Sequence, residues 1–234
     1  MIVFAMMISS QKNTIYNQEL FSFLRNKSGY EITFTGTAKS CCVGIVDIVN
    51  STAITTRLTN EKMCEYYSVF LNAMARILRR YNVTVVKNMG DSLLYYFPRT
   101  EDGIDKMALA DVIECGLQMI DSHEVINMVL GEFNLPRLDY RISADYGMIS
   151  IATCPRTDDQ DVFGPTVNLC SKINGAAKPN SLVIGGDLHQ IIKSLRDYEF
   201  DVIGEYMLGL KLNYPVYSVC HRIEKSGFRK TMFF

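Results

Sequence analysis

The sequence of 234 residues contains no long run of lysine and arginine, no acidic tail and no repeated or low-complexity tract. With 24 basic and 25 acidic residues, its formal net charge is -1, so it lacks the basic footprint typical of nucleic-acid-binding proteins. Hydrophobic residues make up 48% of the chain and charged residues 21%, the usual balance of a globular protein with a sizeable core. We therefore expect one large domain, with or without an extension, and no nucleic-acid partner.

Long apolar segments are also missing. The opening "MIVFAMMI" is apolar for eight residues, far fewer than the ~20 that a membrane-spanning helix needs, and no positively charged segment precedes it. The seven cysteines are odd in number, form no C-x-x-C pair and show no metal-ligand spacing. These absences predict a cytoplasmic protein with no membrane span, whose cysteines are buried free thiols.

The hydrophobic pattern that is present predicts strands and helices in a definite order. "CCVGIVDIV", from Cys41, has the length and composition of a strand. Apolar residues then recur every three or four positions from Asn60 to Arg80, which predicts a helix. "VTVVKN" and "SLLYYF" predict a β-hairpin around Gly90. The division expected is an N-terminal extension over 1–40, a main domain over 41–222 and a tail over 223–234.

The second half continues the alternation. A second helical period predicts an apolar face made of Met107, Ala110, Ile113, Leu117 and Ile120. "LDYRISADYGMISIATC" suggests two strands around Gly147, and a helix is expected from about Pro165 to Gly175. Consecutive hairpins argue against a doubly wound parallel sheet, which needs a helix after nearly every strand. The expected fold class is α+β, with helices covering one face of the sheet.

Two carboxylates interrupt apolar runs of this pattern. Asp47 lies within "VGIVDIVNST" and Asp91 follows the hairpin turn. A buried, unpaired carboxylate is costly, and two carboxylates at strand ends could converge on Mg²⁺ or Mn²⁺. The "NST" after Asp47 predicts a helix N-terminus, which favours phosphate. The alternative is that Asp47 caps a strand and Asp91 belongs to a turn.

Further polar residues are less informative when each is taken alone. Asn168 and Lys172 are four residues apart, so they share one helix face, and such a pair is usually solvated. Arg141 resembles an ordinary strand charge, and Asp161 precedes an aromatic–Gly–Pro turn. The three histidines show no catalytic spacing.

Taken together, these segments resemble the catalytic domain of class III nucleotidyl cyclases from about residue 41 to residue 220. The resemblance is carried, in the family's order, by "GIVDIVNST", "VKNMGDSLLYYF", "YRISADYG", "DVFGPTVNLCSKINGAAKPNSLVI" and "MLGLKLNYPVYSV". It implies a ferredoxin-like, mixed or antiparallel sheet with helices packed on it. It also implies two half-sets of active-site residues.

The first half-set would hold metal and phosphate. By resemblance, Asp47 and Asp91 bind two divalent cations, Mg²⁺ or Mn²⁺, with the backbone carbonyl of Ile48. The same resemblance assigns the triphosphate to Ser51, Thr52 and Arg141.

The second half-set would read the nucleoside. Lys87 and Asp161 match the positions that read the base, and lysine with aspartate suits adenine. Asn168 would orient the ribose. Lys172 stands where the family has an arginine that stabilises developing charge, so the bidentate fork is lost. The closing segment has Leu208, Gly209, Leu210 and Lys211 where the family often has a phosphate-binding lysine.

The resemblance therefore implies an adenylate cyclase that converts ATP to 3′,5′-cyclic AMP and pyrophosphate at the interface of a head-to-tail homodimer. The alternative is a cyclase-like nucleotide-binding or dimerising regulatory module with little turnover, which Lys172 favours. A guanylate cyclase is disfavoured by Lys87 and Asp161, and a purely structural domain ranks last.

Overall fold

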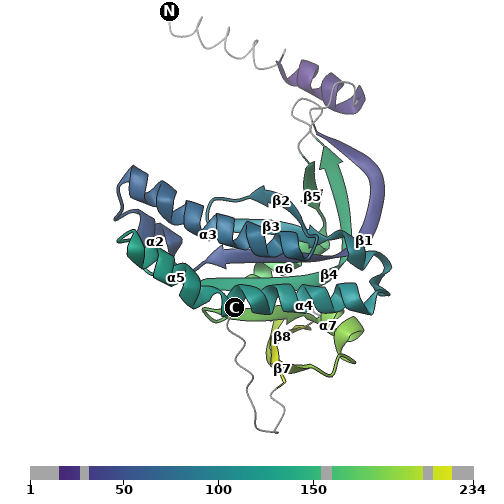
Figure 1. Cartoon of the computed structure of the whole chain (residues 1–234). Helices are drawn as coiled ribbons and strands as arrows, with labels where there is room; N and C mark the ends of the chain where they lie inside the picture. The colour runs from purple at the N-terminus through teal and green to yellow at the C-terminus, as the bar shows by residue number, and fades with distance from the viewer. Residues whose placement is uncertain (1–15, 27–31, 154–159, 208–212, 223–234) are drawn as a thin grey trace, which may run out of the picture.

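The computed structural model describes residues 16–26, 32–153, 160–207 and 213–222, except the side chains of 35–37 and 205–207 (Figure 1). Eight strands form one sheet in the order β2-β3-β1-β4-β6-β8-β7, with β5 paired to β4. All pairs are antiparallel except β4 with β6, so the sheet is mixed, as the sequence predicts. The strands are β1 (Thr33–Ile48), β2 (Thr84–Asn88), β3 (Ser92–Phe97), β4 (Tyr140–Thr153), β5 (Gln160–Phe163), β6 (Ser181–Gly185), β7 (Tyr198–Met207) and β8 (Asn213–His221).

One face of the sheet carries most of the helices and the larger apolar core. The helices of the described chain that enter this core are α3 (Asn60–Arg80), α4 (Lys106–Asp121), α5 (His123–Glu132) and α7 (Gly186–Ile192). The α3 bounds are those that the apolar spacing predicts, and Phe70, Met74 and Ile77 are buried on its inner face. In α4 the predicted face is partly wrong: Met107 is 76% exposed, while Leu109 and Val112 are buried.

The opposite face is covered by α6 (Pro165–Asn174), which lies behind the strands in Figure 1. Its Cys170 packs with Cys41, Val43 and Ile45 of β1 in a second, smaller core. The expectation that helices cover one face alone is therefore wrong. Both faces of β1 need cover because consecutive residues from Cys41 to Val46 are all buried.

The two central strands are longer than the sequence predicts. β1 begins at Thr33, ahead of Cys41, because the polar residues before Cys41 pair with the end of β4. β4 runs unbroken through Gly147, so the prediction of two strands around this glycine is wrong. A Cβ at Gly147 would lie 2.7 Å from Oγ1 of Thr166, so this glycine allows α6 to approach the sheet closely.

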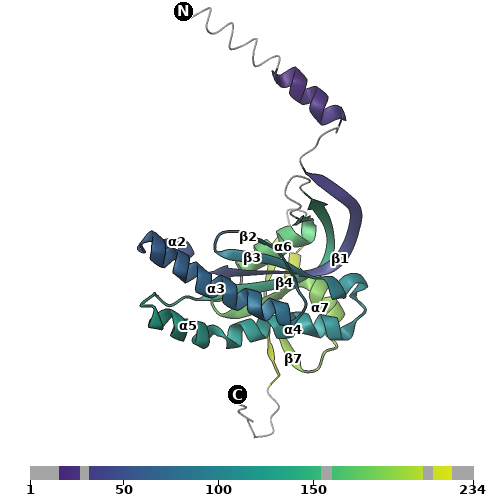
Figure 2. The same ribbon diagram turned by 45° about the horizontal axis from the view of Figure 1, so that its top comes forward.

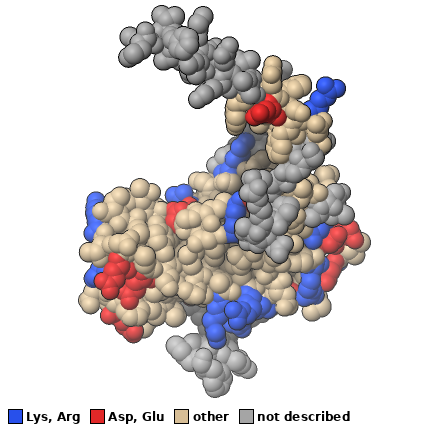
Figure 3. All heavy atoms as spheres, turned by 90° about the horizontal axis from the view of Figure 1, so that it is seen from above, with Lys and Arg blue, Asp and Glu red and all other residues tan. Residues whose placement is uncertain are grey.

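Residues 16–26 form a helix that stands apart from these layers (Figure 2). No helix in the described part of the chain is both long enough and apolar enough to span a membrane. Figure 3 shows charges of both signs in small separate groups on one face of the molecule, with no continuous basic surface there.

Candidate active site

The β2–β3 hairpin brings the two carboxylates together. Asp47 lies one residue from the end of β1 and pairs in register with Ser92, the first residue of β3. The backbone N–H of Ile48 donates to the carbonyl oxygen of Asp91 at 3.3 Å. The strand ends therefore hold the two aspartates side by side, as their positions in the sequence predict.

The environment of Asp47 disfavours its negative charge. Burial, together with the negative charge of Asp91, raises its pKa to about 6, although the positive charge of Arg141 acts in the opposite direction. Arg141 is the register partner of Asp47 across β1 and β4. Its Nε atom is buried without a hydrogen-bond partner in the described structure. The site thus combines two neighbouring carboxylates, Asp47 and Asp91, with an N–H group of Arg141 that has no acceptor in the described structure.

The segment after β1 adds a hydroxyl to this pair. Asn50 has a left-handed backbone (φ 56°), and the short helix α2 (Ser51–Thr55) follows it. The predicted helix N-terminus is present, but Asn50, its N-cap residue, makes no side-chain capping hydrogen bond. Instead, the buried Ser51 donates a hydrogen bond to the carboxylate of Asp91, while Thr52 is exposed. The start of α2 therefore places one hydroxyl, that of Ser51, against Asp91 and leaves the next, that of Thr52, exposed.

The oxygen donors suit a hard divalent cation. Asp47 and Asp91 are carboxylates, and the raised pKa of Asp47 reflects its burial and its repulsion by Asp91, both of which a bound cation would offset. The described residues contain no cluster of three or more His, Cys, Asp and Glu side chains, so these two carboxylates would leave coordination positions for carbonyl oxygens, water or substrate. The carbonyl of Ile48 is the predicted protein ligand of that kind. These residues fit Mg²⁺ or Mn²⁺.

A pocket of about 220 Å³ opens beside Asp47. Its lining includes residues that the sequence reasoning overlooked; the full set is Ile45, Asp47, Met89, Ser92, Arg141, Ser171, Asn174 and Gly175. Asn174 is the most informative of these residues because it is polar and buried at the end of α6. The four-residue spacing of Thr166, Cys170 and Asn174 in the sequence is a signal that would have found it.

The predicted base readers lie together on a different part of the sheet. Nζ of Lys87, on β2, lies 2.6 Å from Oδ2 of Asp161, on β5, and their side chains are 41% and 32% exposed. Lys87 therefore pairs with a residue 74 positions away, not with Asp91 across its own turn. The predicted separation of Lys87 from Asp91 agrees with this arrangement.

Asn168 and Lys172 are both exposed on α6. In the described structure, no hydrogen bond or ion pair joins Lys87, Asp161, Asn168 or Lys172 to the two aspartates. We call these four residues the nucleoside half-site. The carboxylate half-site consists of Asp47, Ile48, Ser51, Thr52, Asp91 and Arg141. Residues 208–211, the predicted closing segment, fall outside the described residues.

Six cysteines of the described chain are free thiols, and Cys154 is outside it. Cys41, Cys42, Cys115 and Cys170 are buried as predicted, whereas Cys64 and Cys220 are exposed. Burial raises the pKa of Cys41 to about 11 and that of Cys115 to about 12, so these thiols are inert.

Comparisons with known proteins identify relatives of this chain. An adenylate cyclase of Streptomyces coelicolor is 26% identical over 142 residues, which are 61% of this chain and 31% of that relative. The chain thus corresponds to about a third of that relative's length.

Solved structures share the fold. The adenylyl cyclase CyaB from P. aeruginosa has a TM-score of 0.72 at 20% identity, covering 85% of this chain and 100% of that one. The guanylate cyclase domain of RhGC from Catenaria anguillulae, in complex with GTP, has a TM-score of 0.68 at 18% identity, covering 80% and 100%. The family model for the adenylate and guanylate cyclase catalytic domain matches residues 34–220. The chain therefore belongs to this cyclase family.

Proposed function

We propose that the protein is an adenylate cyclase that converts ATP to 3′,5′-cyclic AMP and pyrophosphate. The observation that carries the choice of ATP is the exposed pair of Lys87 and Asp161, which places a donor beside an acceptor. Adenine offers a ring-nitrogen acceptor next to an amino donor, the complement of this pair. Guanine offers the reverse order on the corresponding edge, so the pair would leave both of its groups mismatched.

The carboxylate half-site would bind the reacting phosphates. Asp47, Asp91 and the carbonyl of Ile48 would hold two divalent cations, which when bound supply Lewis-acid activation of a hydroxyl and neutralisation of phosphate charge. Ser51 and Thr52 would donate to the triphosphate. The buried Nε of Arg141, without a partner in the described structure, would gain an acceptor there.

The nucleoside half-site would orient the other end of the substrate. Asn168 would position the ribose so that its 3′-oxygen attacks the α-phosphorus in line, the bond to the bridging oxygen breaks and pyrophosphate leaves. The proton of the hydroxyl passes to solvent. Lys172 would stabilise the charge that develops on the phosphates, so catalysis is mainly positioning and electrostatics.

The two half-sites would meet across a homodimer. In the described chain no polar contact joins them, and the nucleoside half-site is exposed. A head-to-tail pair with two-fold symmetry would place each carboxylate half-site opposite its partner's nucleoside half-site, giving two complete sites.

The first experiment measures cyclic product from ATP and from GTP, with Mg²⁺ and with Mn²⁺. Asp47→Ala is expected to lower the rate by roughly 10³-fold, because it removes a predicted metal ligand. Product from ATP no greater than that of Asp47→Ala, in every condition, would contradict the proposal. It would favour the alternative, a binding or dimerising module, which Lys172 supports as a departure from the family.

The second experiment tests the dimer by mixing two inactive chains. Asp47→Ala and Lys172→Ala, refolded together, would form one intact site in each mixed dimer and so recover about a quarter of the wild-type activity. No recovery in dimers shown to be mixed would contradict shared sites. The six free thiols fit a reducing compartment, so we propose the cytoplasm as the location.

A further inference from the structure

The face of α6 that meets the sheet contains a row of buried residues with polar groups, beside apolar residues such as Ile173. Thr166, Cys170 and Asn174 follow one another at intervals of four, which places them on one side of the helix. All three are at most 5% exposed. Asn168 and Lys172 form a different row at an interval of four and are exposed. We call Thr166, Cys170 and Asn174 the docking row, because they face the sheet, whereas Asn168 and Lys172 face away from it.

Each residue of the docking row makes polar contact with a central strand. Oγ1 of Thr166 donates to the carbonyl of Met148 at 2.9 Å, over the close approach that Gly147 permits. The hydroxyl of Ser143, on β4, donates to the carbonyl of Cys170 at 3.0 Å. These contacts fix the helix along its length because unpaired buried donors would be costly.

Asn174 ends the row, next to the carboxylate half-site. Its Nδ2 lies 3.4 Å from the carbonyl oxygen of Ile45, 3.4 Å from that of Arg141 and 3.2 Å from Oγ of Ser143. Ile45 lies two residues before Asp47, and Arg141 is the register partner of Asp47. A single carboxamide therefore contacts both strands that carry the carboxylate half-site, from the helix that carries Asn168 and Lys172.

We propose that Asn174 is a positioning residue that fixes the two half-sites of one chain relative to each other. This inference rests on the proposed function, in which those half-sites belong to different active sites of the dimer. Loss of the carboxamide would let the end of α6 shift against β1 and β4, and both active sites would lose geometry. Misplacement of this kind can cost about 100-fold in rate even when it arises away from the reacting atoms.

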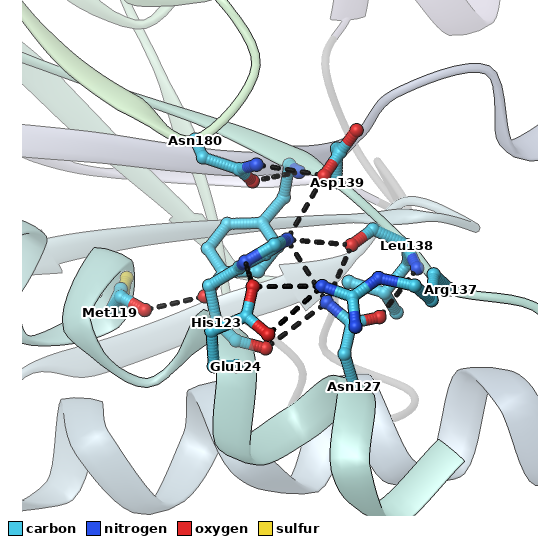
Figure 4. Close-up of polar contacts among 9 residues, drawn as sticks. Met119, His123, Glu124, Asn127, Arg137, Leu138, Asp139 and Asn180 are labelled. Atoms are coloured by element: carbon cyan, nitrogen blue, oxygen red, sulfur yellow. Dashed lines mark hydrogen bonds and ion pairs between the residues drawn. The ribbon is translucent and has the colours of Figure 1, made fainter. Parts of the chain in front are cut away.

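The chain offers a matched control in Asn127, on α5. This asparagine is 3% exposed, against 5% for Asn174, and it also bonds to strand-flanking backbone: Nδ2 donates to the carbonyl of Leu138 at 3.0 Å, and the N–H of Leu138 donates to Oδ1 at 2.8 Å. Figure 4 shows it among His123, Glu124 and Arg137. α5 packs into the core on the opposite face from α6, so Asn127 has the same chemistry without contact with the docking row.

The test compares Asn174→Ala with Asn127→Ala in the full chain. Both are expected to lower the melting temperature by roughly 2–8 °C, since each removes a buried hydrogen-bonded amide. Asn174→Ala should lower kcat for ATP roughly 10- to 100-fold with KM changed less than about threefold, while Asn127→Ala keeps kcat within about twofold. Equal kcat values for the two variants would overturn the proposal.

Hydrogen exchange supplies a readout that does not depend on activity. Asn174→Ala should speed amide exchange in 165–174 and in 45–48, whereas Asn127→Ala should leave both segments at the wild-type rate. If the wild type forms no cyclic nucleotide, the proposed function fails, and exchange still decides whether Asn174 fixes α6. Unchanged exchange in these segments would overturn the positioning role even in an active cyclase.

A mixed dimer with one intact site then tests whether Asn174 affects both the carboxylate half-site and the nucleoside half-site of its own chain. In the mixture of Asp47→Ala with Lys172→Ala chains, Asn174→Ala is added to one chain or to the other. Loss of activity from either placement is expected, because the intact site takes its carboxylates from one chain and its α6 from the other. Loss from only one placement would overturn the claim that Asn174 serves both half-sites.

Discussion

The two half-sites differ in how much of their structure a single chain completes. The carboxylate half-site is partly buried and already interacts internally: Ser51 donates to Asp91, and Asp91 raises the pKa of Asp47. The nucleoside half-site is exposed, and its described polar contact is the pair of Lys87 with Asp161. The charge of the carboxylate half-site is thus tuned within one chain, whereas the proposed base recognition would need a further surface to exclude water from Lys87 and Asp161. Three predictions examine this contrast.

The largest effect is expected from exchanging the charges of the nucleoside half-site. Lys87→Asp with Asp161→Lys keeps an exposed ion pair, so the free energy of unfolding should stay within about 1 kcal/mol of the wild type. The donor and acceptor would face adenine in reversed order, and kcat/KM for ATP should fall roughly 10³-fold or more. Rates with ATP and GTP, and urea unfolding, measure the two outcomes. Recovery of ATP turnover in the double variant, relative to the single ones, would show that the pair is only structural.

A smaller effect is expected where the chain departs from the family. Lys172→Arg would restore a planar group with two parallel donors, and kcat should rise roughly tenfold, or about 1.4 kcal/mol of transition-state stabilisation. Lys178 is an exposed lysine just beyond α6, so Lys178→Arg serves as the control and should leave kcat unchanged. A rate unchanged by Lys172→Arg would mean that lysine already suffices.

The smallest effect concerns stability and pH in the carboxylate half-site. Because the pKa of folded Asp47 is raised to about 6 from an ordinary value of 3.8, the folded state binds the extra proton and stability falls as the pH rises through that interval. Asp47→Asn removes this loss, so in chelator it should melt a few degrees above the wild type at pH 7.

Near pH 4 that difference should largely disappear, since both proteins then carry a neutral side chain at position 47. Melting curves across this range, with the exposed Asp201→Asn as a control, measure it. If the difference in melting temperature between Asp47→Asn and the wild type does not vary with pH, ionisation of Asp47 is not its cause.

Much of this arrangement could be predicted from local pattern. The strong 3.6-residue period gave the bounds of α3, and polar residues at strand ends predicted that Asp47 and Asp91 would meet. Gly147 misled because a glycine between apolar runs is usually a turn, whereas here it admits α6 against β4. The residues next to Gly147 in the sequence do not indicate that a distant segment packs against it.

Other features depended on long-range pairing. The residues from Thr33 to Ser40 look like a polar turn, and they become a strand because β4 offers them partners. Asn174 went unnoticed because a polar residue near a helix end usually faces solvent, and its burial follows from the docking of α6 on two strands.

The register of β1 has a consequence for anyone who alters the chain ahead of the site. Pairing with β4 shifts between Phe34 and Ala38 and is then regular from Ala38 to Ile48. An extra residue inserted within the regular part would send Asp47 to the opposite face of the sheet, away from Asp91. The same residue inserted at the shift would be taken up by an irregularity that already exists there. We therefore expect β1 to tolerate a change of length near Phe34 but not near Asp47.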